Sequence, residues 1–372
     1  MDWVRGEKIG HGSFATISKA KPKKGSSDKA LPPLMAVKSS QGSSSETLKN
    51  EKRVLGRIGT CPQIIRCFGD QNSFENGEKL HNLLLEYASG GSLADQVKLH
   101  GGKLPEPDIR RHTRAVLKGL SFVHAKGFVH CDIKLQNILF FDNGAAKIAD
   151  FGLAKEASKT EEAKTEHRCE LRGTPLYMSP ESVNDNEYEP PCDIWALGCA
   201  VVEMATGKPA WNNREAESNI WKLLVRIGGE ELPGIPEELS EEGRDFLSKC
   251  FVKDPRRRWT AEMLLNHAFV GGDDDDDDGS DDTVLLEEAN RLSASPRCPF
   301  DFPEWVSCTS EPHDSHVVEI SPESDYVFLY GSGGSTCIPF SPSDRVRQLF
   351  TDAKSCCSFS DDWVTVRNNN SF

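Results

Sequence analysis

The chain has 372 residues, 37% of them hydrophobic and 27% charged, and its formal net charge is −14. It contains no run of about 18 apolar residues, so we expect no membrane-spanning helix. From residue 271 onward there are 21 acidic and 6 basic side chains, which leaves the preceding residues at +1. The nearly neutral charge of residues 1–270 argues against nucleic acid as a partner, because phosphate backbones bind basic surfaces.

The N-terminal residues and the cysteines indicate the compartment. Residues 1–5 lack the apolar region of a secretory signal. The 12 cysteines are scattered, and none has the spacing of a zinc site, so they are expected to be reduced thiols. We therefore expect the protein in the cytoplasm, the nucleus or both.

The hydrophobic pattern predicts an α+β chain of two lobes. Short β-like runs occur at residues 7–9, 17–20, 35–38, 64–68 and 83–87. One helix interrupts them, with Leu48 and Leu55 seven apart on one face. The pattern from 108 to 269 is mostly helical, with long helices at 109–124 and 192–206. We expect a small β-rich lobe over about 3–88 and a larger helical lobe over about 89–270.

A glycine-rich turn joins the first two candidate strands at residues 10–15. It follows the pattern G-x-G-x-x-G except that Ala15 replaces the third glycine. Because such a turn has little side-chain bulk, its backbone N–H groups can cover the phosphates of a nucleotide. A glycine-rich hairpin without a ligand explains this motif alone equally well.

Lys38 ends the otherwise apolar run 35–38. A lysine that points from a strand into a cleft needs anionic partners. Nucleotide phosphates and Glu51, on the following helix, would supply them. The alternative is a lysine exposed to water at the end of a strand.

The most specific motif is Val-His-Cys-Asp-Ile-Lys-Leu-Gln-Asn at residues 129–137. Asp132 can accept the proton of a substrate hydroxyl, and Lys134 can neutralise a transferring phosphoryl group. Asn137 and Asp150, which opens Asp-Phe-Gly, can hold magnesium. Thr174 is expected to hydrogen-bond Asp132 and Lys134. Phosphoryl transfer needs such a set because its catalysis consists of positioning and charge neutralisation.

Two further motifs predict contacts that support this site. Glu181, in Ser-Pro-Glu, should pair with a buried arginine, for which Arg258 is the candidate. Asp193 begins the long helix at 192–206 and is expected to brace the backbone around His130. Each contact has an ordinary structural role alone, but together and in this order they favour one fold.

Residues 3–270 resemble the eukaryotic serine/threonine protein kinases, in which two lobes enclose ATP. The resemblance rests on the motifs above, and Lys134 is the residue typical of serine/threonine kinases. Gly-Thr-Pro at 173–175, Gly-Gly-Ser-Leu at 90–93, His-Cys-Asp at 130–132 and Phe-Asp-Phe-Pro-Glu-Trp at 300–305 are similar to plant MEKK-type mitogen-activated protein kinase kinase kinases. This implies that the substrates are activation-loop serines or threonines of mitogen-activated protein kinase kinases, in stress or hormone signalling.

The resemblance also implies the cofactors, ATP and Mg²⁺, and the residues that bind them. The expected catalytic residues are Asp132, Lys134, Lys38 and Glu51, and the expected metal ligands are Asn137 and Asp150. The expected nucleotide-binding residues are Ile9, Gly10, His11, Gly12, Ser13, Phe14, Ala15, Thr16, Ile17, Ala36, Lys38, Leu85, Glu86 and Ala88. Leu85 is expected to be the gatekeeper, because the apolar run that contains it ends just before two glycines.

Cys131 departs from the family pattern, since most members carry arginine before the catalytic aspartate. That arginine pairs with a phosphate on the activation loop. We therefore expect activity to depend less on phosphorylation of Ser158, Thr160 or Thr165 than in most relatives. Arg168 or Arg172 could replace the missing cation, and Lys155 or Lys159 could bind a phosphate weakly.

The alternative interpretation, from another functional class, is a pseudokinase or scaffold that binds partners without catalysis. Such proteins usually lack the strand lysine, the catalytic aspartate or the metal aspartate. Lys38, Asp132, Asn137 and Asp150 are all present here, which favours an active enzyme.

The C-terminal part is expected to differ in character from the rest. Residues 273–278 are six consecutive aspartates, whose repulsion predicts a linker over 271–282. Residues 283–372 predict a largely disordered, low-complexity tail with a regulatory or docking role. Ser295, Ser321 and Ser341 each precede a proline and are candidates for feedback by downstream mitogen-activated protein kinases, although such pairs are also common in tails without this role.

Overall fold

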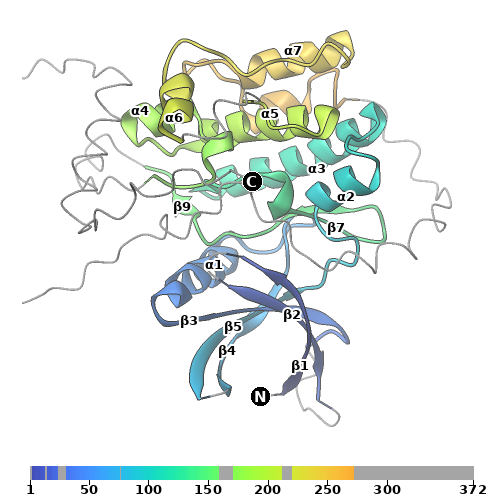
Figure 1. The fold of residues 1–372 in the computed structure, drawn as a ribbon, viewed down its shortest axis with the longest axis vertical. Coiled ribbons are helices and arrows are strands. Elements are labelled where there is room, and N and C mark those ends of the chain that lie inside the picture. Colours follow the sequence, from blue (N-terminus) through green and yellow to red (C-terminus); the bar gives the residue numbers. More distant parts are fainter. Residues whose placement is uncertain are drawn as a thin grey trace, which may run out of the picture.

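The computed structural model describes residues 2–12, 15–23, 31–75, 77–158, 171–211 and 220–271. They form two lobes, one built on a five-stranded antiparallel sheet with one helix and the other mainly helical (Figure 1). The α+β, two-lobed fold predicted from the sequence is therefore confirmed. The predicted tail and all of the linker but Gly271 lie outside the described residues, and so do the three serines proposed for feedback.

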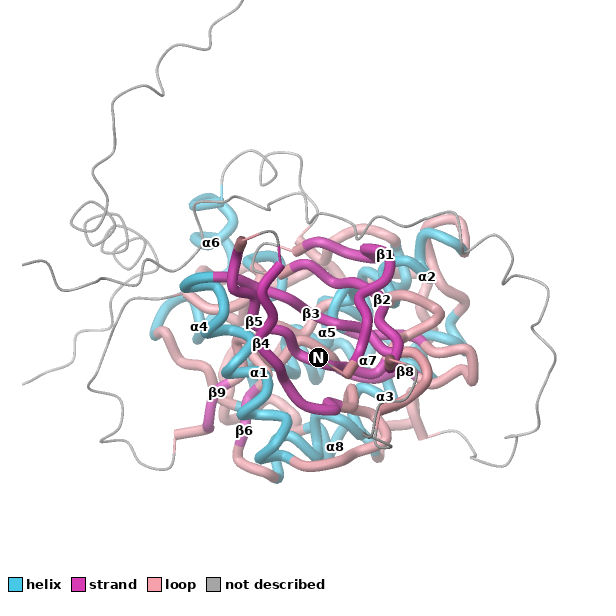
Figure 2. The backbone as a smooth tube through the Cα atoms, turned by 90° about the horizontal axis from the view of Figure 1, so that it is seen from below, coloured by secondary structure: helices cyan, strands magenta, loops and turns pink. Residues whose placement is uncertain are grey.

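The small lobe is built on a sheet with the strand order β1-β2-β3-β5-β4. Its elements are β1 (Trp3–His11), β2 (Thr16–Pro22), β3 (Met35–Gln41), α1 (Ser45–Ile58), β4 (Cys67–Glu75) and β5 (Glu78–Glu86). Helix α1 buries Leu48, Val54, Leu55 and Ile58, and this apolar face packs against β3, β4 and β5. Figure 2 shows α1 beside the strands of the sheet, and Figure 1 shows it on the side of the sheet that faces the large lobe.

The large lobe is organised around two long helices, α3 and α5. Its elements are α2 (Leu93–Leu99), α3 (Glu106–Ala125), β6 (Phe128–Val129), β7 (Ile138–Phe140), β8 (Ala146–Ile148), β9 (Lys155–Glu156), α4 (Pro180–Asp185), α5 (Pro190–Thr206), α6 (Ile220–Gly228), α7 (Glu241–Cys250) and α8 (Ala261–Leu265). Nearly every residue of α5 from Cys192 to Ala205 is buried, so this helix forms the centre of the lobe. It packs against α3, α7 and β6.

One predicted strand is wrong over most of its length. Residues 64–68 were expected to be a strand, but β4 begins only at Cys67 and continues to Glu75. Ile64 and Ile65 are instead tied to the large lobe: Ile65 N donates to Ile148 O, and Ile148 N donates to Gln63 O (both 2.9 Å). The hydrophobic pattern does not predict β4 because its sequence, Cys-Phe-Gly-Asp-Gln-Asn-Ser-Phe-Glu, is mostly polar and the strand lies at the edge of the sheet.

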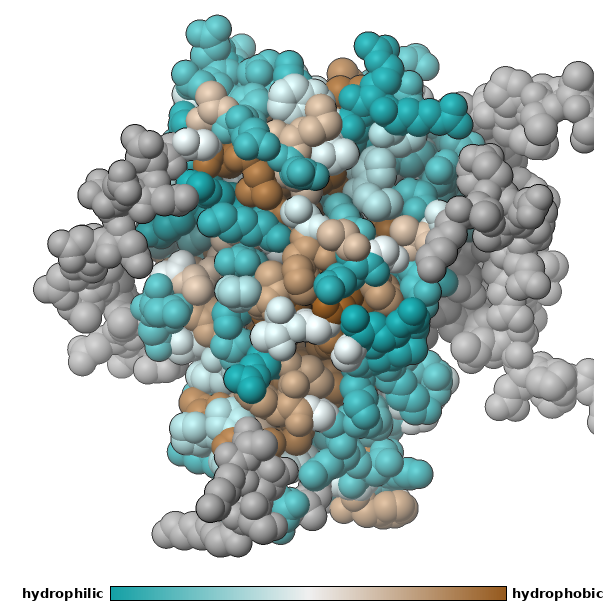
Figure 3. Space-filling model, turned by 180° about the vertical axis from the view of Figure 1, so that it is seen from behind, coloured by the Kyte–Doolittle hydropathy of each residue, from teal (hydrophilic) through white to brown (hydrophobic). Residues whose placement is uncertain are grey.

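The face of the molecule opposite to that in Figure 1 is mainly polar. Seen from behind, hydrophilic side chains cover most of it, and apolar ones gather mainly towards the middle (Figure 3). No helix in the described part of the chain is both long and apolar enough to cross a membrane.

Candidate active site

Lys38, Glu51 and Asp150 meet at the boundary between the lobes. Lys38 Nζ lies 2.8 Å from Glu51 Oε2 and 2.8 Å from Asp150 Oδ1. The predicted ion pair with Glu51 is therefore present, although β3 runs three residues beyond Lys38 to Gln41. Glu51 Oε1 also accepts a hydrogen bond from Phe151 N (3.3 Å). One carboxylate of α1 thus joins the β3 lysine to the Asp-Phe-Gly segment.

The charges of these groups depend on one another. Burial alone would lower the pKa of Lys38, but Asp150 and Glu51 together raise it above its ordinary value, so the ammonium group stays charged. Burial works to raise the pKa of Asp150, and Lys38 overcomes this and lowers it to about 2. Burial raises the pKa of Glu51, against the attraction of Lys38. The site therefore presents one fixed cation and an ionised Asp150.

The carboxylate of Asp132 is held on both oxygens. Oδ1 accepts hydrogen bonds from Thr174 Oγ1 (2.7 Å) and Thr174 N (3.0 Å). Oδ2 accepts one from Asn137 Nδ2 (2.9 Å) and lies 3.0 Å from Lys134 Nζ. Lys134 Nζ in turn donates to Thr174 Oγ1 (2.8 Å). The contacts predicted for Thr174 are therefore present, and they fix the carboxylate in one orientation.

Asn137 and Asp150 are the candidate metal ligands. Ala149 N, next to Asp150, donates to Asn137 O (2.8 Å), which keeps the two segments together. Because the amide nitrogen of Asn137 donates to Asp132, its side-chain oxygen remains available to a cation. The described residues contain no group of three or more His, Cys, Asp or Glu side chains that could hold a metal. Two oxygen ligands completed by substrate phosphates are the typical environment of Mg²⁺, so these residues fit that ion.

The expected nucleotide-binding residues lie along β1, β2, β3 and β5. The turn between β1 and β2 is closed by a hydrogen bond from Gly12 N to Ala15 O (2.9 Å); Ser13 and Phe14 lie outside the described residues. Ala36 on β3 pairs with Leu85 on β5. Of the expected nucleotide-binding residues, Ala15, Ala36 and Leu85 belong to the apolar core cluster that extends through both lobes. Ile17 and Ala88 pack against this cluster. Glu86 directs its carboxylate to Lys147 (2.6 Å), and its backbone N donates to Arg66 O (2.9 Å).

Asp193 braces the loop that carries Asp132, as predicted. Its Oδ2 accepts from His130 N and its Oδ1 from Cys131 N (both 2.9 Å), and His124 Nε2 lies 2.8 Å from Oδ2. Burial opposes ionisation of Asp193, but the hydrogen bond from His124 leads the contacts that lower its pKa. This ionised carboxylate holds Cys131 in a left-handed conformation (φ 68°) that non-glycine residues rarely adopt.

Gly173 is required by this arrangement. Its φ is +93°, and a Cβ atom there would lie 2.3 Å from Cys131 O. Only glycine allows the segment with Thr174 to approach the catalytic loop this closely.

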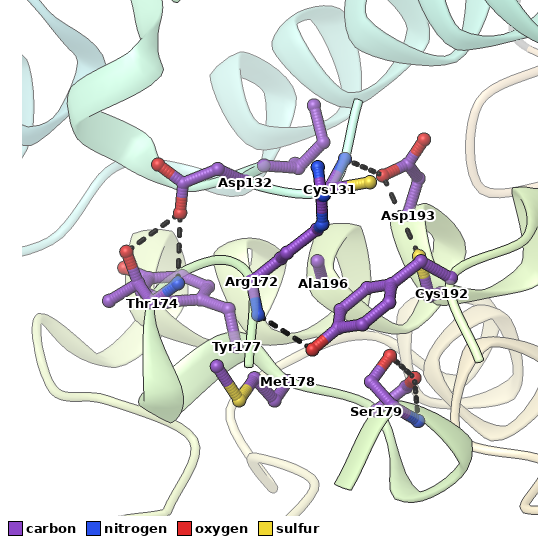
Figure 4. A pocket seen from close by; sticks show the side chains of 13 residues that line it. Cys131, Asp132, Arg172, Thr174, Tyr177, Met178, Ser179, Cys192, Asp193 and Ala196 are labelled. Atoms are coloured by element: carbon purple, nitrogen blue, oxygen red, sulfur yellow. Dashed lines mark hydrogen bonds between the residues drawn. The ribbon is translucent and has the colours of Figure 1, made fainter. Parts of the chain in front are cut away.

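A small cavity lies beneath this loop, lined in part by Cys131, Arg172, Tyr188 and Cys192 (Figure 4). Its volume is about 20 Å³, room for one water molecule. A hydrogen bond with Cys131, together with burial, raises the pKa of Cys192 well above its ordinary value, so that thiol is neutral. Arg172 is the only cation among the described lining residues. Cys131 thus contributes no positive charge at the position before Asp132, where the resemblance implies an arginine.

The uncharged side chain of Cys131 leads to a prediction about the activation loop. Replacing Ser158, Thr160 and Thr165 together with alanine is expected to leave most activity towards an exogenous substrate, because a loop phosphate orders its segment only by meeting cations. Initial rates of the triple variant and the natural protein measure this. A hundredfold loss, about 2.7 kcal/mol of transition-state stabilisation, would show that Arg172 or another cation serves a phosphorylation switch.

The structure also shows contacts that the sequence did not reveal. Asn50, beside Glu51 on α1, donates to Gly152 O (2.8 Å) and Ala154 O (2.9 Å). Leu139, on β7 of the large lobe, packs against the apolar core cluster that extends through both lobes, and it forms a β-bridge with Ser92. An asparagine in a helix and a leucine in a strand carry no distinctive sequence signal, so only their spatial neighbours mark them.

Comparison with known proteins agrees with this geometry. The model of the protein kinase domain matches residues 3–270. The chain is 51% identical to mitogen-activated protein kinase kinase kinase 20 of Arabidopsis thaliana, over 99% of this chain and 100% of the relative. It is 40% identical to the kinase kinase kinase 17 of the same plant (73% of this chain, 70% of the relative) and 39% identical to number 18 (73% and 78%).

Proposed function

The chain belongs to the protein kinase family and is a protein serine/threonine kinase; from this premise we propose that it phosphorylates mitogen-activated protein kinase kinases on their activation loops, using MgATP. The single observation that best supports an active enzyme is the Lys38–Glu51 ion pair. The similarity to a mitogen-activated protein kinase kinase kinase over 99% of the chain supports a kinase kinase as its substrate.

In the proposed mechanism, Asp132 orients the substrate hydroxyl and accepts its proton. Its carboxylate is already fixed by Thr174 and Asn137, so little reorganisation is needed as the reaction proceeds. Lys134, 3.0 Å from Asp132, stabilises the charge that develops on the transferred phosphoryl group. Lys38, positioned by Glu51, holds the phosphates of ATP. Mg²⁺, held by Asn137 and Asp150, would neutralise phosphate charge.

The adenine is proposed to lie against the hinge. Leu85 and Ala36 would form one apolar wall, and the backbone at Glu86 and Ala88 would provide hydrogen bonds.

A screen of purified kinase kinases tests the substrate class. Each candidate is first inactivated at its own strand lysine, so that any phosphate comes from this enzyme, and the sites are mapped by mass spectrometry. We expect phosphate on activation-loop serine or threonine residues, and alanine at those positions should abolish it. Phosphate confined to other proteins, or to other segments of the kinase kinases, would contradict the proposal.

A further inference from the structure

The start of the activation segment is anchored by an acidic residue outside the motifs described above. Glu189 immediately precedes α5. Its two carboxylate oxygens accept hydrogen bonds from Ser158 N at 3.0 and 3.1 Å. Lys155 Nζ lies 3.4 Å from Glu189 Oε1. One carboxylate therefore binds a cation and a backbone N–H group on the same short segment.

This segment lies directly beside the catalytic loop. Lys155 and Glu156 form β9, which pairs with Phe128 and Val129 of β6, and β6 leads into Cys131 and Asp132. Ala157 N donates to Gly127 O (2.8 Å). Figure 1 shows β9 at the edge of the large lobe, close to α1. A change in the position of β9 is therefore transmitted to the loop that carries the proposed base.

A loop phosphate would have to do what Glu189 already does. A phosphate orders a segment by offering negative charge and acceptor oxygens to cations and N–H groups. Glu189 offers both to Lys155 and Ser158 N, whereas Cys131 offers no cation to a phosphate. We propose that Glu189 is a positioning residue that holds the start of the activation segment in place of a loop phosphate, and that Ser158 is a modification site whose phosphorylation lowers activity.

The negative charge of a phosphate explains why phosphorylation of Ser158 would lower activity. Ser158 is exposed, so its hydroxyl can take the terminal phosphoryl group of ATP, with release of ADP and of the hydroxyl proton. The product carries about −1.5 to −2 charges on the same residue whose N–H group binds Glu189. Like charges at this distance repel, and the phosphate competes with Glu189 for Lys155. The modification therefore separates Ser158 from its anchor.

The test adds or removes a negative charge at positions 158 and 189 of the full chain. It rests on the proposed kinase activity. The variants are Ser158→Asp, Glu189→Gln and the two together, with Ser158→Asn as the neutral control of matched shape. Ser158→Asp and Glu189→Gln, each alone, are expected to lower kcat/KM for an inactivated kinase kinase by about tenfold, equivalent to about 1.4 kcal/mol, with KM for ATP unchanged. Ser158→Asn should stay within about twofold, a difference of about 0.4 kcal/mol.

The double variant distinguishes positioning from a general structural role. In the Glu189→Gln background, the carboxylate that Ser158→Asp introduces can meet Lys155. Ser158→Asp is therefore expected to raise activity there, although it lowers activity when Glu189 is present. A merely structural role gives no such change of sign. An increase with Ser158→Asp in the natural background, unaltered activity with Glu189→Gln, or the same sign in both backgrounds would each overturn the proposal.

Hydrogen exchange separates this proposal from the assignment of the substrate. Amide exchange at residues 155–158 should be faster in Glu189→Gln and in Ser158→Asp than in the natural protein, and slower again in the double variant. This measurement needs no substrate. If the exchange rates follow this order while no kinase kinase is phosphorylated, the proposed function fails and the anchor stands; unchanged exchange with active enzyme refutes the anchor alone.

Discussion

Replacing Asp132 with asparagine is expected to lower phosphoryl transfer by about a hundredfold to a thousandfold or more, the range for a lost general base or charge-stabilising group. Asparagine cannot accept the substrate proton. Its NH₂ group would also face a donor, because both oxygens of Asp132 accept hydrogen bonds or lie beside Lys134. Transfer of labelled phosphate from ATP, with the protein's melting temperature as a check on folding, measures the effect.

Two companion variants should behave in the same way. Lys38→Met removes the cation between Glu51 and Asp150, and Asp150→Ala removes a proposed metal ligand. Lys38→Met should fold, because burial already raises the pKa of Glu51 and its carboxyl group can take up a proton. Asp150→Ala should fold because Lys38 keeps its ion pair with Glu51. Asp142→Asn, an exposed position on the β7–β8 turn, is the matched control and should retain full activity.

The same experiment decides between the enzyme and the scaffold. If the natural protein transfers no more phosphate than Asp132→Asn, in the presence of Mg²⁺ and a range of protein substrates, the chain acts by binding alone. Natural-level transfer by Asp132→Asn would instead show that another residue is the base.

The largest effect on stability is expected at the ion pair between Glu181 and Arg258. The two side chains form two hydrogen bonds, of 2.6 and 2.9 Å, and the Arg258 side chain is fully buried. Arg258 also donates to Val252 O and Pro191 O (both 2.8 Å). This guanidinium therefore joins the first turns of α4 and α5 to the segment between α7 and α8, and the contact predicted from the sequence is present.

Glu181→Gln is expected to lower the free energy of unfolding by about 3–5 kcal/mol, because it leaves a buried guanidinium without its counterion. Arg258→Met should cost a similar amount. The double variant should cost less than the sum of the two, since it leaves no buried unpaired charge. Denaturant titration of the purified proteins gives these values.

A surface ion pair provides the matched comparison. Lys249 and Asp245 lie 2.9 Å apart on α7, with exposed fractions of 31% and 51%, and Lys249→Met should change the free energy of unfolding by less than about 1 kcal/mol. If Glu181→Gln has as small an effect as Lys249→Met, the buried ion pair does not stabilise the large lobe.

The sequence by itself determined the chemistry of the site. Asp132, Lys134, Asn137 and Asp150 lie within short motifs whose residue types and spacing have few uses other than phosphoryl transfer. The partner of Lys38 could be predicted because Glu51 lies on the next helix, a short distance along the chain. Local periodicity also located α1, α3 and α5, since each has a distinct buried face or is buried throughout.

Only the tertiary structure decided which distant segments support that chemistry. Glu189 binds Ser158 across 31 residues, and Asn50 binds Gly152 across 102; nothing local marks either residue. The strand at 67–75 was missed because its polar residues gain their pairing from β5 and not from burial. Motifs report the groups that the reaction needs, whereas anchors of this kind depend on how the lobes pack, and packing is a property of the whole chain.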